Sequence, residues 1–260
     1  FCSVAGSGDF AGDRVDPIAV QFQTIKARSK EKWQDAQYIA FFQAYTNTHA
    51  PLPVLKEKFE AALQLPGVIG LSIATRPDCL PEDVLDYLAE LNTRTHLWVE
   101  LGLQTIHEET ATLINRAHTF QTYIEGVEQL RKRNISIVSH IINGLPGESI
   151  EMMMETAREV AKLDIQGLKI HLLHLLKGTP MVKQYERGKL QFLTREEYIQ
   201  LVVDQLELIP QHVVIHRITG DGPVKDLIGP MWSVSKWEVL NAIDRELERR
   251  ESYQGKGVLQ

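Results

Sequence analysis

Short apolar runs alternate with longer amphipathic segments along this chain. The short runs show little alternation of polar and apolar residues, which is typical of parallel strands buried on both faces. The longer segments space their apolar residues three and four apart, as amphipathic helices do. The runs are residues 38–45, 68–74, 97–103, 136–142, 167–173 and 213–218, and the helical segments are 16–34, 54–65, 81–91, 122–132, 150–163, 194–208 and 235–250.

Six strands that alternate with helices predict an α/β protein with a parallel sheet. The element lengths suit a partial (β/α) barrel of about six parallel strands, and a doubly wound open sheet is the alternative. In either fold the chemistry is expected at the C-terminal ends of the strands. The segments at those ends are rich in polar side chains, which is the first functional signal. They are residues 43–48, 75–78, 100–104, 140–148, 169–177 and 216–221.

No linker, repeat or low-complexity tract divides the 260 residues, and a hydrophobic content of 43% suffices for one large core. We therefore expect a single domain over residues 1–260, with a C-terminal extension from about residue 220 that ends in a helix. The formal net charge of -6 disfavours broad, non-specific binding of nucleic acids. No stretch approaches the ~18 apolar residues of a membrane span. Two cysteines indicate a reducing cytoplasm rather than a disulfide scaffold.

Glu100 interrupts an otherwise apolar strand in the stretch VELGLQT. A buried carboxylate is costly unless it has a partner or a ligand. A functional role is favoured because Gln104 and Thr105 follow at the strand end. The alternative is a structural ion pair, with Arg76 or Arg116 as the partner.

Arg76 lies in the stretch ATRPDCLPED, where its guanidinium could clamp a carboxylate or phosphate. An ion pair with Asp78 that orders the loop explains it nearly as well. Cys79 is expected to be a buried small hydrophobe rather than a nucleophile. Arg116 and His118, taken alone, are expected on the solvated surface.

Alternation along the strand in KIHLLHLLKG places Lys169 and His171 on one face and His174 on the other. This spacing excludes a metal site made of the two histidines, so at least one of them is expected in the core with its hydrogen bonds satisfied. The stretch NGLPGES, residues 143–149, joins a strand to a helix. Its glycines permit a close approach to a ligand, and an ordinary βα turn explains it equally well.

Taken together, several stretches resemble the radical S-adenosylmethionine (radical SAM) superfamily, in particular the YhcC/YtqA group and the radical SAM domain of the Elongator catalytic subunit. The resemblance covers most of the chain in the family's order and implies a partial (β/α) barrel. The stretches that carry it are FQAYTNT, GLSIATRPDCLPEDVL, VELGLQT followed by INRAH, SHIINGLPGE and GLKIHLLHLLKGT.

The family's cluster motif ends in Cys-x-aromatic-Cys, and Phe1 and Cys2 resemble its last two positions. The resemblance implies a [4Fe–4S] cluster held by three cysteines, which leaves one iron open for SAM. Reductive cleavage of SAM then yields a 5′-deoxyadenosyl radical, and the cofactor carries this chemistry. The other two cysteines and the first barrel strand are expected upstream of residue 1, so this chain by itself is expected to be inactive and without a cluster.

The resemblance also implies residues that contact SAM or support its site. Gln43 and Thr46 match positions at the methionine end of SAM. Ala74 falls where relatives often place a contacting Glu, and Arg76 is a nearby substitute. Glu100 is expected to support the site from the neighbouring strand.

Further positions carry over from the strands that follow. His118 and His140 match positions that face the ribose, and Gly144 ends its strand near the adenine. Lys169 and His171 are expected to line the cavity and to face the substrate.

The resemblance to the Elongator subunit implies RNA modification, with a tRNA base as the substrate and flavodoxin or ferredoxin as the electron donor, in the cytoplasm. A porphyrin-type small molecule is a second substrate class. A metal-independent barrel lyase or hydrolase would instead use Glu100 with Lys169 or His171 as acid and base. A binding scaffold without catalysis is disfavoured by the polar strand ends.

Overall fold

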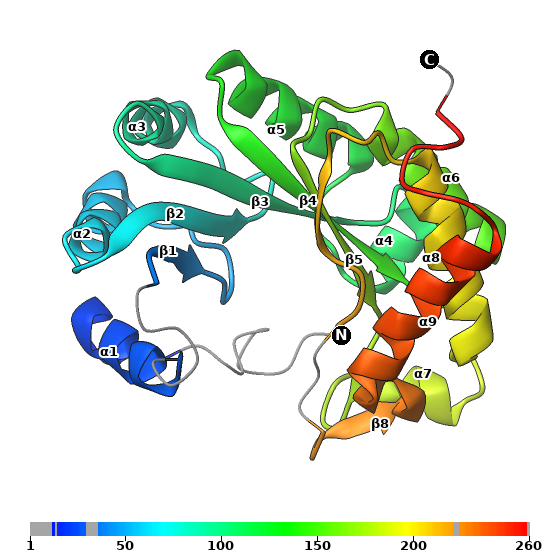
Figure 1. Ribbon diagram of the computed structural model, residues 1–260. Coiled ribbons are helices and arrows are strands. Elements are labelled where there is room, and N and C mark those ends of the chain that lie inside the picture. The colour runs from blue at the N-terminus through cyan, green and yellow to red at the C-terminus, as the bar shows by residue number, and fades with distance from the viewer. Residues whose placement is uncertain (1–11, 14, 30–35, 221–223, 259–260) are drawn as a thin grey trace.

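The computed structural model describes residues 12–13, 15–29, 36–220 and 224–258. Within these residues six parallel strands form one sheet in the order β1-β2-β3-β4-β5-β7 (Figure 1). The strands are β1 (Tyr38–Phe42), β2 (Val68–Thr75), β3 (His96–Gln104), β4 (Ser136–Asn143), β5 (Gly167–Leu172) and β7 (Val214–Arg217).

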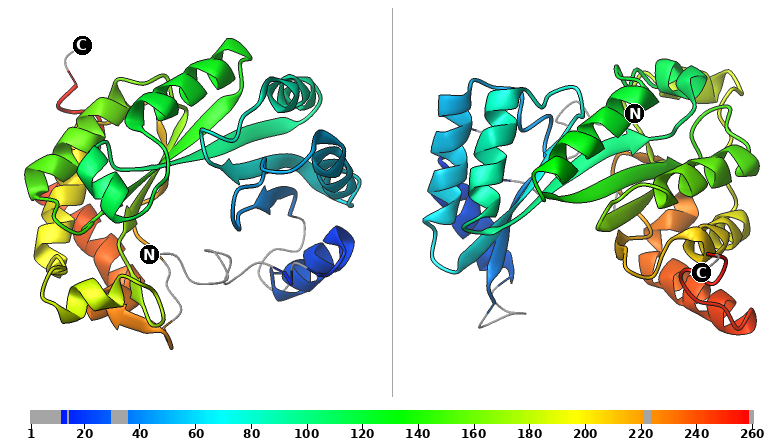
Figure 2. Two further views of the ribbon diagram at one scale, coloured as in Figure 1. Left: turned by 180° about the vertical axis from the view of Figure 1, so that it is seen from behind. Right: turned by 90° about the horizontal axis from the view of Figure 1, so that it is seen from above.

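The strand order decides between the two predicted architectures. Neighbours in the sheet follow one another along the chain, so the order never reverses as it does at the switch point of a doubly wound sheet. Each crossover therefore places its helices on the same face, and the sheet curls into a half-barrel with the helices outside it (Figures 1 and 2). The predicted partial barrel is confirmed, and the doubly wound alternative is wrong.

Helices cover the convex face of the curled sheet (Figure 2). The seven predicted helices are present, with boundaries shifted by at most two residues where the structure describes them, and the short α4 and α7 add to them. Residues 30–34 of the first predicted helix lie outside the described residues. The helices are α1 (Ile18–Ser29), α2 (Leu52–Leu63), α3 (Glu82–Asn92), α4 (Glu108–Leu113), α5 (Phe120–Lys132), α6 (Ile150–Ala161), α7 (Val182–Glu186), α8 (Arg195–Leu208) and α9 (Lys236–Arg249).

Local capping explains where several helices begin. The side chain of Thr194 accepts a hydrogen bond from the backbone N–H of Glu197, and the Glu197 carboxylate accepts one from the backbone N–H of Thr194, which completes a capping box at α8. The side chain of Ser149 caps α6 by accepting from Met152 N. Glu148 does not join this cap, because its carboxylate accepts a hydrogen bond from Thr105 Oγ1 at 2.5 Å instead.

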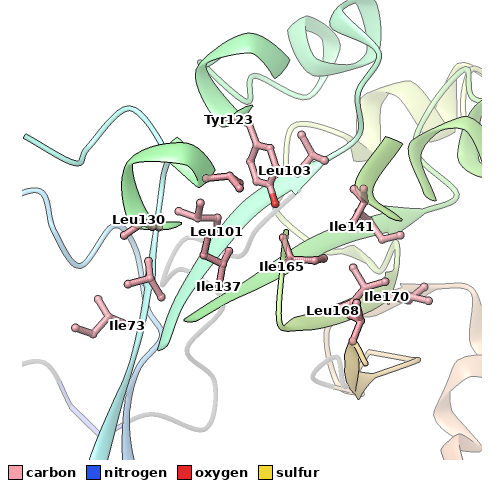
Figure 3. Packing of buried hydrophobic residues seen from close by; sticks show 14 of the residues in the cluster. Ile73, Leu101, Leu103, Tyr123, Leu130, Ile137, Ile141, Ile165, Leu168 and Ile170 are labelled. Carbon is pink, nitrogen blue, oxygen red and sulfur yellow. The ribbon is translucent and has the colours of Figure 1, made fainter. Parts of the chain in front are cut away.

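The core lies between the convex face of the sheet and the helices. Alternate residues of the central strands point into it, among them Ile73, Leu101, Ile137 and Ile170 (Figure 3). Each such side chain, once fully buried, stabilises the fold by about 1.5–3 kcal/mol. The core is therefore one-sided, and the opposite residues of the same strands face the concave side without helical cover.

A small second sheet follows β5. Strand β6 (Leu175–Leu176) pairs antiparallel with β8 (Leu227–Gly229), and a 3-10 turn, η1 (Met231–Val234), follows β8. Leu175 of this sheet belongs to a separate apolar cluster, together with Met181 at the start of α7 and Leu190 after it. None of the described helices is both long and apolar enough to cross a membrane.

Candidate functional site on the concave face of the sheet

The concave face carries a line of polar side chains across its centre. Glu100 of β3, His140 of β4 and Lys169 of β5 all point to this face, because each lies between two residues that point into the core. His140 and Lys169 are direct partners in the sheet. His171, two residues further along β5, points the same way.

Glu100 stands at the centre of this line and accepts from four side chains. Its Oε2 accepts hydrogen bonds from His140 Nε2 at 2.7 Å and from Lys169 Nζ at 2.5 Å. Its Oε1 accepts one from Ser72 Oγ at 2.7 Å and a longer one from Trp98 Nε1 at 3.4 Å. We name Glu100, His140 and Lys169 the carboxylate cluster.

These contacts correct the predicted partners of Glu100. Arg76 and Arg116 do not pair with it; His140 and Lys169 do. The two arginines lie in loops beyond the C-terminal ends of β2 and β3, whereas Glu100 lies in the middle of its strand. Ser72 and Trp98 were missed as its partners. Trp98, Glu100, Gly102 and Gln104 share a face by period two, and this was the available signal for Trp98.

The charge states of the carboxylate cluster follow from burial and from these contacts. Burial opposes ionisation of Glu100, but the hydrogen bonds and charges of His140 and Lys169 outweigh it and hold the Glu100 pKa well below its usual range. Burial lowers the pKa of His140 and of Lys169, and the adjacent carboxylate counteracts both shifts. Glu100 is thus a permanent anion, and its lone pairs are already engaged.

Lys169 also contacts an aromatic ring. Its Nζ lies 4.6 Å from the ring centroid of Phe41 on β1, which joins the edge strand to the carboxylate cluster across the concave face. Arg217 of β7 is the sheet partner of Lys169, and its positive charge lowers the pKa values of His140 and His171.

His171 also lies on this face. Its ring lies 5.1 Å from the ring of His140, centroid to centroid. Its Nε2 atom is buried and has no hydrogen-bond partner among the residues that the structure describes. Burial, followed by the charges of His140 and Arg217, lowers the pKa of His171 well below its usual value, so the ring is neutral. An unpaired buried nitrogen is rare in native proteins and calls for a ligand or another explanation.

The other histidine of that strand end behaves differently. His174 Nε2 lies 3.0 Å from Ser233 Oγ, and the ring packs against Gly220. This is the satisfied histidine that the alternation of the strand predicted.

The loop after β2 is ordered by an ion pair. Arg76 Nε and Nη2 donate to the two carboxylate oxygens of Asp78 at 2.9 and 2.5 Å. Nη2 also donates to the Ala117 carbonyl at 3.3 Å. This is the arrangement of the loop-ordering alternative, because the edge of the guanidinium that would clamp a ligand already holds Asp78.

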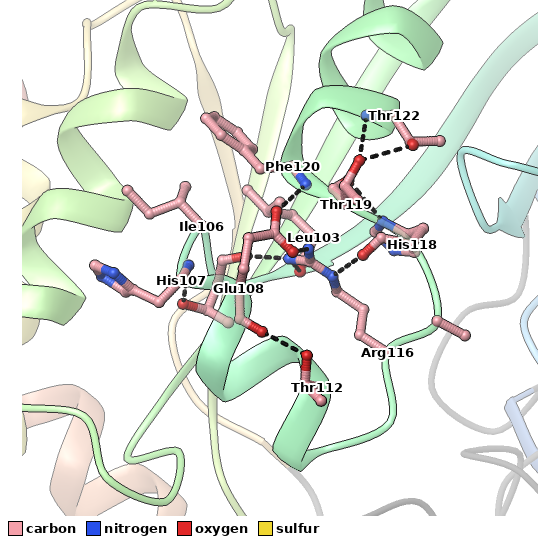
Figure 4. Close-up of polar contacts among 12 residues, drawn as sticks. Leu103, Ile106, His107, Glu108, Thr112, Arg116, His118, Thr119, Phe120 and Thr122 are labelled. Carbon is pink, nitrogen blue, oxygen red and sulfur yellow. Dashed lines mark hydrogen bonds and ion pairs between the residues drawn. The ribbon is translucent and has the colours of Figure 1, made fainter.

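Arg116 lies beneath the loop after β3 and is buried, contrary to the expected solvated surface. Its guanidinium donates to the carbonyls of Leu103, Thr105 and His118 and to the Glu108 carboxylate (Figure 4). It therefore supplies donors to backbone oxygens at the end of β3 and in the segment that follows it.

His118 is also half-buried rather than solvated. Its Nε2 lies 3.1 Å from the Gly102 carbonyl on β3, and its pKa is lowered by burial. The adjacent Ala117 has a φ of 66°, and Gln104 at the end of β3 has one of 65°. Such strained backbone gathers at binding and active sites, so it supports a site at this edge of the sheet.

The remaining predicted residues lie at two other strand ends. Gln43 and Thr46 belong to the loop after β1, which Asn47 fastens to β2 by donating to the carbonyls of Phe42 and Ala74. Gly144 follows β4 with a φ of 84°, which only glycine adopts readily. Its backbone N–H points to Met153 Sδ at 3.1 Å.

The chain has two cysteines, Cys2 and Cys79. Cys2 lies outside the described residues. Cys79 is partly buried beside His49, and burial raises the pKa of its thiol, which agrees with an inert side chain. Within the described residues, no group of three or more His, Cys, Asp or Glu side chains could hold a metal ion.

Comparison with known proteins decides the family. Residues 1–160 match the model of the radical SAM superfamily, and residues 165–249 match the radical SAM C-terminal domain. The chain belongs to the radical SAM superfamily. It is 70% identical over 256 residues to YtqA of Bacillus subtilis, which covers 98% of this chain and 80% of that protein. The likeness to the YhcC/YtqA group is thereby confirmed.

More distant radical SAM proteins share the fold. The structure of Methanocaldococcus infernus Elp3 with an N-terminal deletion matches with a TM-score of 0.77 at 18% identity, over 92% of this chain and 60% of that one. The tRNA uridine(34) acetyltransferase of M. infernus is 28% identical over 163 residues, which are 62% of this chain and 30% of that protein. The predicted relation to the Elongator catalytic subunit is confirmed at the level of the radical SAM domain.

Proposed function

We propose that this protein is an enzyme that cleaves SAM with the help of a [4Fe–4S] cluster, and that SAM lies against the concave face. The match of residues 1–160 to the radical SAM superfamily carries the proposal. The chemistry that such a cofactor pair supplies is one-electron cleavage of the sulfonium bond of SAM, which generates an organic radical. The protein's share is to bind, to orient and to exclude water.

The concave face suits a ligand with SAM's polar groups. His171 Nε2 is a buried nitrogen in need of a partner, and a hydroxyl or amine of a ligand would provide one. Because His140 Nε2 donates to Glu100, its Nδ1 is the acceptor of that ring and suits a ribose hydroxyl. Glu100 then acts as a positioning residue, which holds His140 and Lys169 in place.

We further propose the family's remaining contacts for this chain. Gln43 and Thr46 would meet the methionine end, and His118 the ribose. Gly144 would meet the adenine. Arg76 would keep its loop ordered rather than bind a carboxylate of SAM, since Asp78 already occupies the edge of the guanidinium that donates two hydrogen bonds.

The described residues do not by themselves offer a ligand set for a cluster. We propose Cys2 as a cluster ligand on the pattern of Phe1 and Cys2 alone. The protein would need a reductant such as flavodoxin or ferredoxin and would work in the cytoplasm.

We propose RNA as the substrate, with a tRNA base as the target. A relative at 28% identity is named a tRNA uridine(34) acetyltransferase, and this supports the choice of RNA over a porphyrin-type small molecule. A metal-independent lyase or hydrolase is disfavoured, because the Glu100 carboxylate is engaged by its neighbours and its pKa lies far below neutrality.

The chain's two cysteines provide a matched test of the cofactor. In the complete gene product, reconstituted anaerobically with iron and sulfide, Cys2→Ala should lose the iron–sulfur absorption and the formation of 5′-deoxyadenosine. Cys79→Ala should retain both, because Cys79 is a half-buried thiol with a raised pKa. Full absorption in the Cys2→Ala variant would remove Cys2 from the ligand set, and a wild-type protein that never cleaves SAM would overturn the enzyme assignment.

His171 provides the test of the SAM site. His171→Phe should keep or raise the unfolding midpoint, because it removes an unpaired buried nitrogen while filling the same space. The affinity for SAM, measured by calorimetry, should fall by about tenfold. This is the loss expected if one hydrogen bond to SAM contributes roughly 1.4 kcal/mol. An unchanged affinity would place SAM away from His171.

A further inference from the structure

A lobe at the rim of the sheet is not used by the proposed SAM site. This rim lobe comprises residues 175–189 and 224–237, and it contains β6, α7, β8 and η1 (Figure 1). It begins shortly after β5 ends at Leu172, so it lies on the side of the strands' C-terminal ends. Its apolar cluster includes Leu145 from the loop after β4 and Ile114 from the segment after β3. The rim lobe therefore borders the loops where the substrate must arrive.

The rim lobe is basic, although the whole chain is acidic. It contains six Lys or Arg residues against two carboxylates, a formal net charge of +4, whereas the chain as a whole carries -6. Three of the basic residues, Lys183, Arg187 and Lys189, are exposed and form no ion pair with the described residues. The six basic residues are Lys177, Lys183, Arg187, Lys189, Lys225 and Lys236, and the two acidic ones are Glu186 and Asp226.

The rim lobe also exposes large apolar side chains. Trp237 at the start of α9 is 74% exposed and Met231 is 58% exposed. Tyr185 of α7 is 39% exposed, and its ring lies 5.1 Å from the ring of Phe192. A lobe that exposes both aromatic rings and the cations Lys183, Arg187 and Lys189 suits nucleic acid with unstacked bases, because the rings stack on bases and the cations attract phosphates.

We infer that the rim lobe binds the RNA substrate, with Lys183, Arg187 and Lys189 on phosphates and Trp237 stacked on an unpaired base. This inference rests on the proposed function, which makes RNA the substrate of the concave face. The positive charge of the rim lobe steers RNA to this side of the protein, because the remainder of the chain has an excess of negative charge that repels RNA. The bound strand would enter the concave face at the end of β5, next to Lys169 and His171.

The experiment compares two charge reversals in the complete gene product. Binding of unfractionated tRNA is measured by fluorescence anisotropy over a range of salt concentrations. The variant Lys183→Glu/Lys189→Glu should bind at least tenfold more weakly, and the slope of log K against log salt should fall by about 0.7 for each phosphate that the variant no longer neutralises. The control Lys58→Glu/Lys132→Glu reverses two exposed lysines on α2 and α5, outside the rim lobe, and should stay within twofold of wild type.

Trp237→Ala separates base stacking from charge. It should weaken binding of single-stranded RNA several-fold while leaving the salt slope unchanged, and it should affect duplex RNA less. Equal tRNA affinities of the wild type and the Lys183→Glu/Lys189→Glu variant would overturn the inference. An equal loss of tRNA affinity in the control variant would overturn it too. So would substitutions in the rim lobe that change only self-association or binding to another protein. SAM binding and 5′-deoxyadenosine formation by the same preparations report separately on the proposed function.

Discussion

Glu100 shows how one buried side chain organises the concave face. The carboxylate is 3% exposed and accepts from residues on β2, β3, β4 and β5. A charge in this position is tolerated because each of its oxygens has donors, and removal of the charge would leave the Lys169 ammonium buried without its partner. The cluster therefore ties the central strands together on the side that has no hydrophobic core.

We predict that Glu100→Gln destabilises the protein by about 3 kcal/mol in urea unfolding at neutral pH, because it breaks a buried ion pair. Asp164→Asn serves as the control, since its surface pair with Arg131 should be worth less than about 1 kcal/mol.

The pH dependence of that difference checks the same contact. The pKa of Glu100 is lowered in the folded state, so its stabilisation is fully present above its unfolded value of 4.5 and is lost as the pH falls below it. The gap between wild type and Glu100→Gln should therefore shrink below pH 4.5. A gap that is constant with pH would show that charge is not its source.

Helix α8 illustrates how local signals place an element correctly. Thr194 and Glu197 form the capping box that defines its start, and a buried face that includes Tyr198 and Val202 attaches it to the core. Further along, Gln205 exchanges hydrogen bonds with Asn143 of β4 at 2.8 and 3.0 Å in the buried interior. The helix is thus set by a local cap and then anchored by a residue that is distant in sequence.

We predict that Thr194→Ala lowers the free energy of unfolding by about 1 kcal/mol, because the backbone N–H of Glu197 at the start of α8 loses its acceptor and the Glu197 carboxylate loses the hydroxyl donor. Thr194→Ser keeps the hydroxyl and should remain within about 0.5 kcal/mol of wild type. The measurement is urea unfolding followed by circular dichroism, and equal effects in both variants would assign the destabilisation to the missing methyl group instead.

At the scale of the whole molecule, the sheet is continuous across the regions that match the two family models. Strands β4 and β5 pair along their length, and they lie on either side of the boundary between those regions. The buried Asn143–Gln205 pair crosses the same boundary. We propose on these grounds that residues 1–260, including the extension from about residue 220, form a single domain.

We predict that urea unfolding of the protein is a single transition, with coincident midpoints for tryptophan fluorescence and far-UV circular dichroism. Gln205→Ala should lower the free energy of unfolding by about 2 kcal/mol or more in both signals alike, because it leaves the buried Asn143 amide unsatisfied. The exposed Gln121→Ala should change the free energy of unfolding by less than about 0.5 kcal/mol in either signal. Two separate transitions would contradict a single domain.

Much of the fold was predictable because the signals are local. Strand and helix periods are read within a few residues, and the caps at Thr194 and Ser149 lie within one helical turn. The alternation that separates His171 from His174 is equally local. The partners of Glu100 on other strands were not predictable, because Lys169, for example, is 69 positions away and becomes a neighbour only through strand register. The burial of Arg116 depends likewise on how the chain returns beneath β3 after α4 (Figure 4).

The sequence alone determined the alternation of six strands with helices, the polar strand ends and the resemblance to radical SAM proteins. Each is a matter of residue type and spacing along the chain. Only the tertiary structure decided the half-barrel over the open sheet, the partners of Glu100, the unpaired nitrogen of His171 and the rim lobe. These depend on which distant residues the strand order brings together, and hydrogen bonds and charge pairs form only between groups that are close in space.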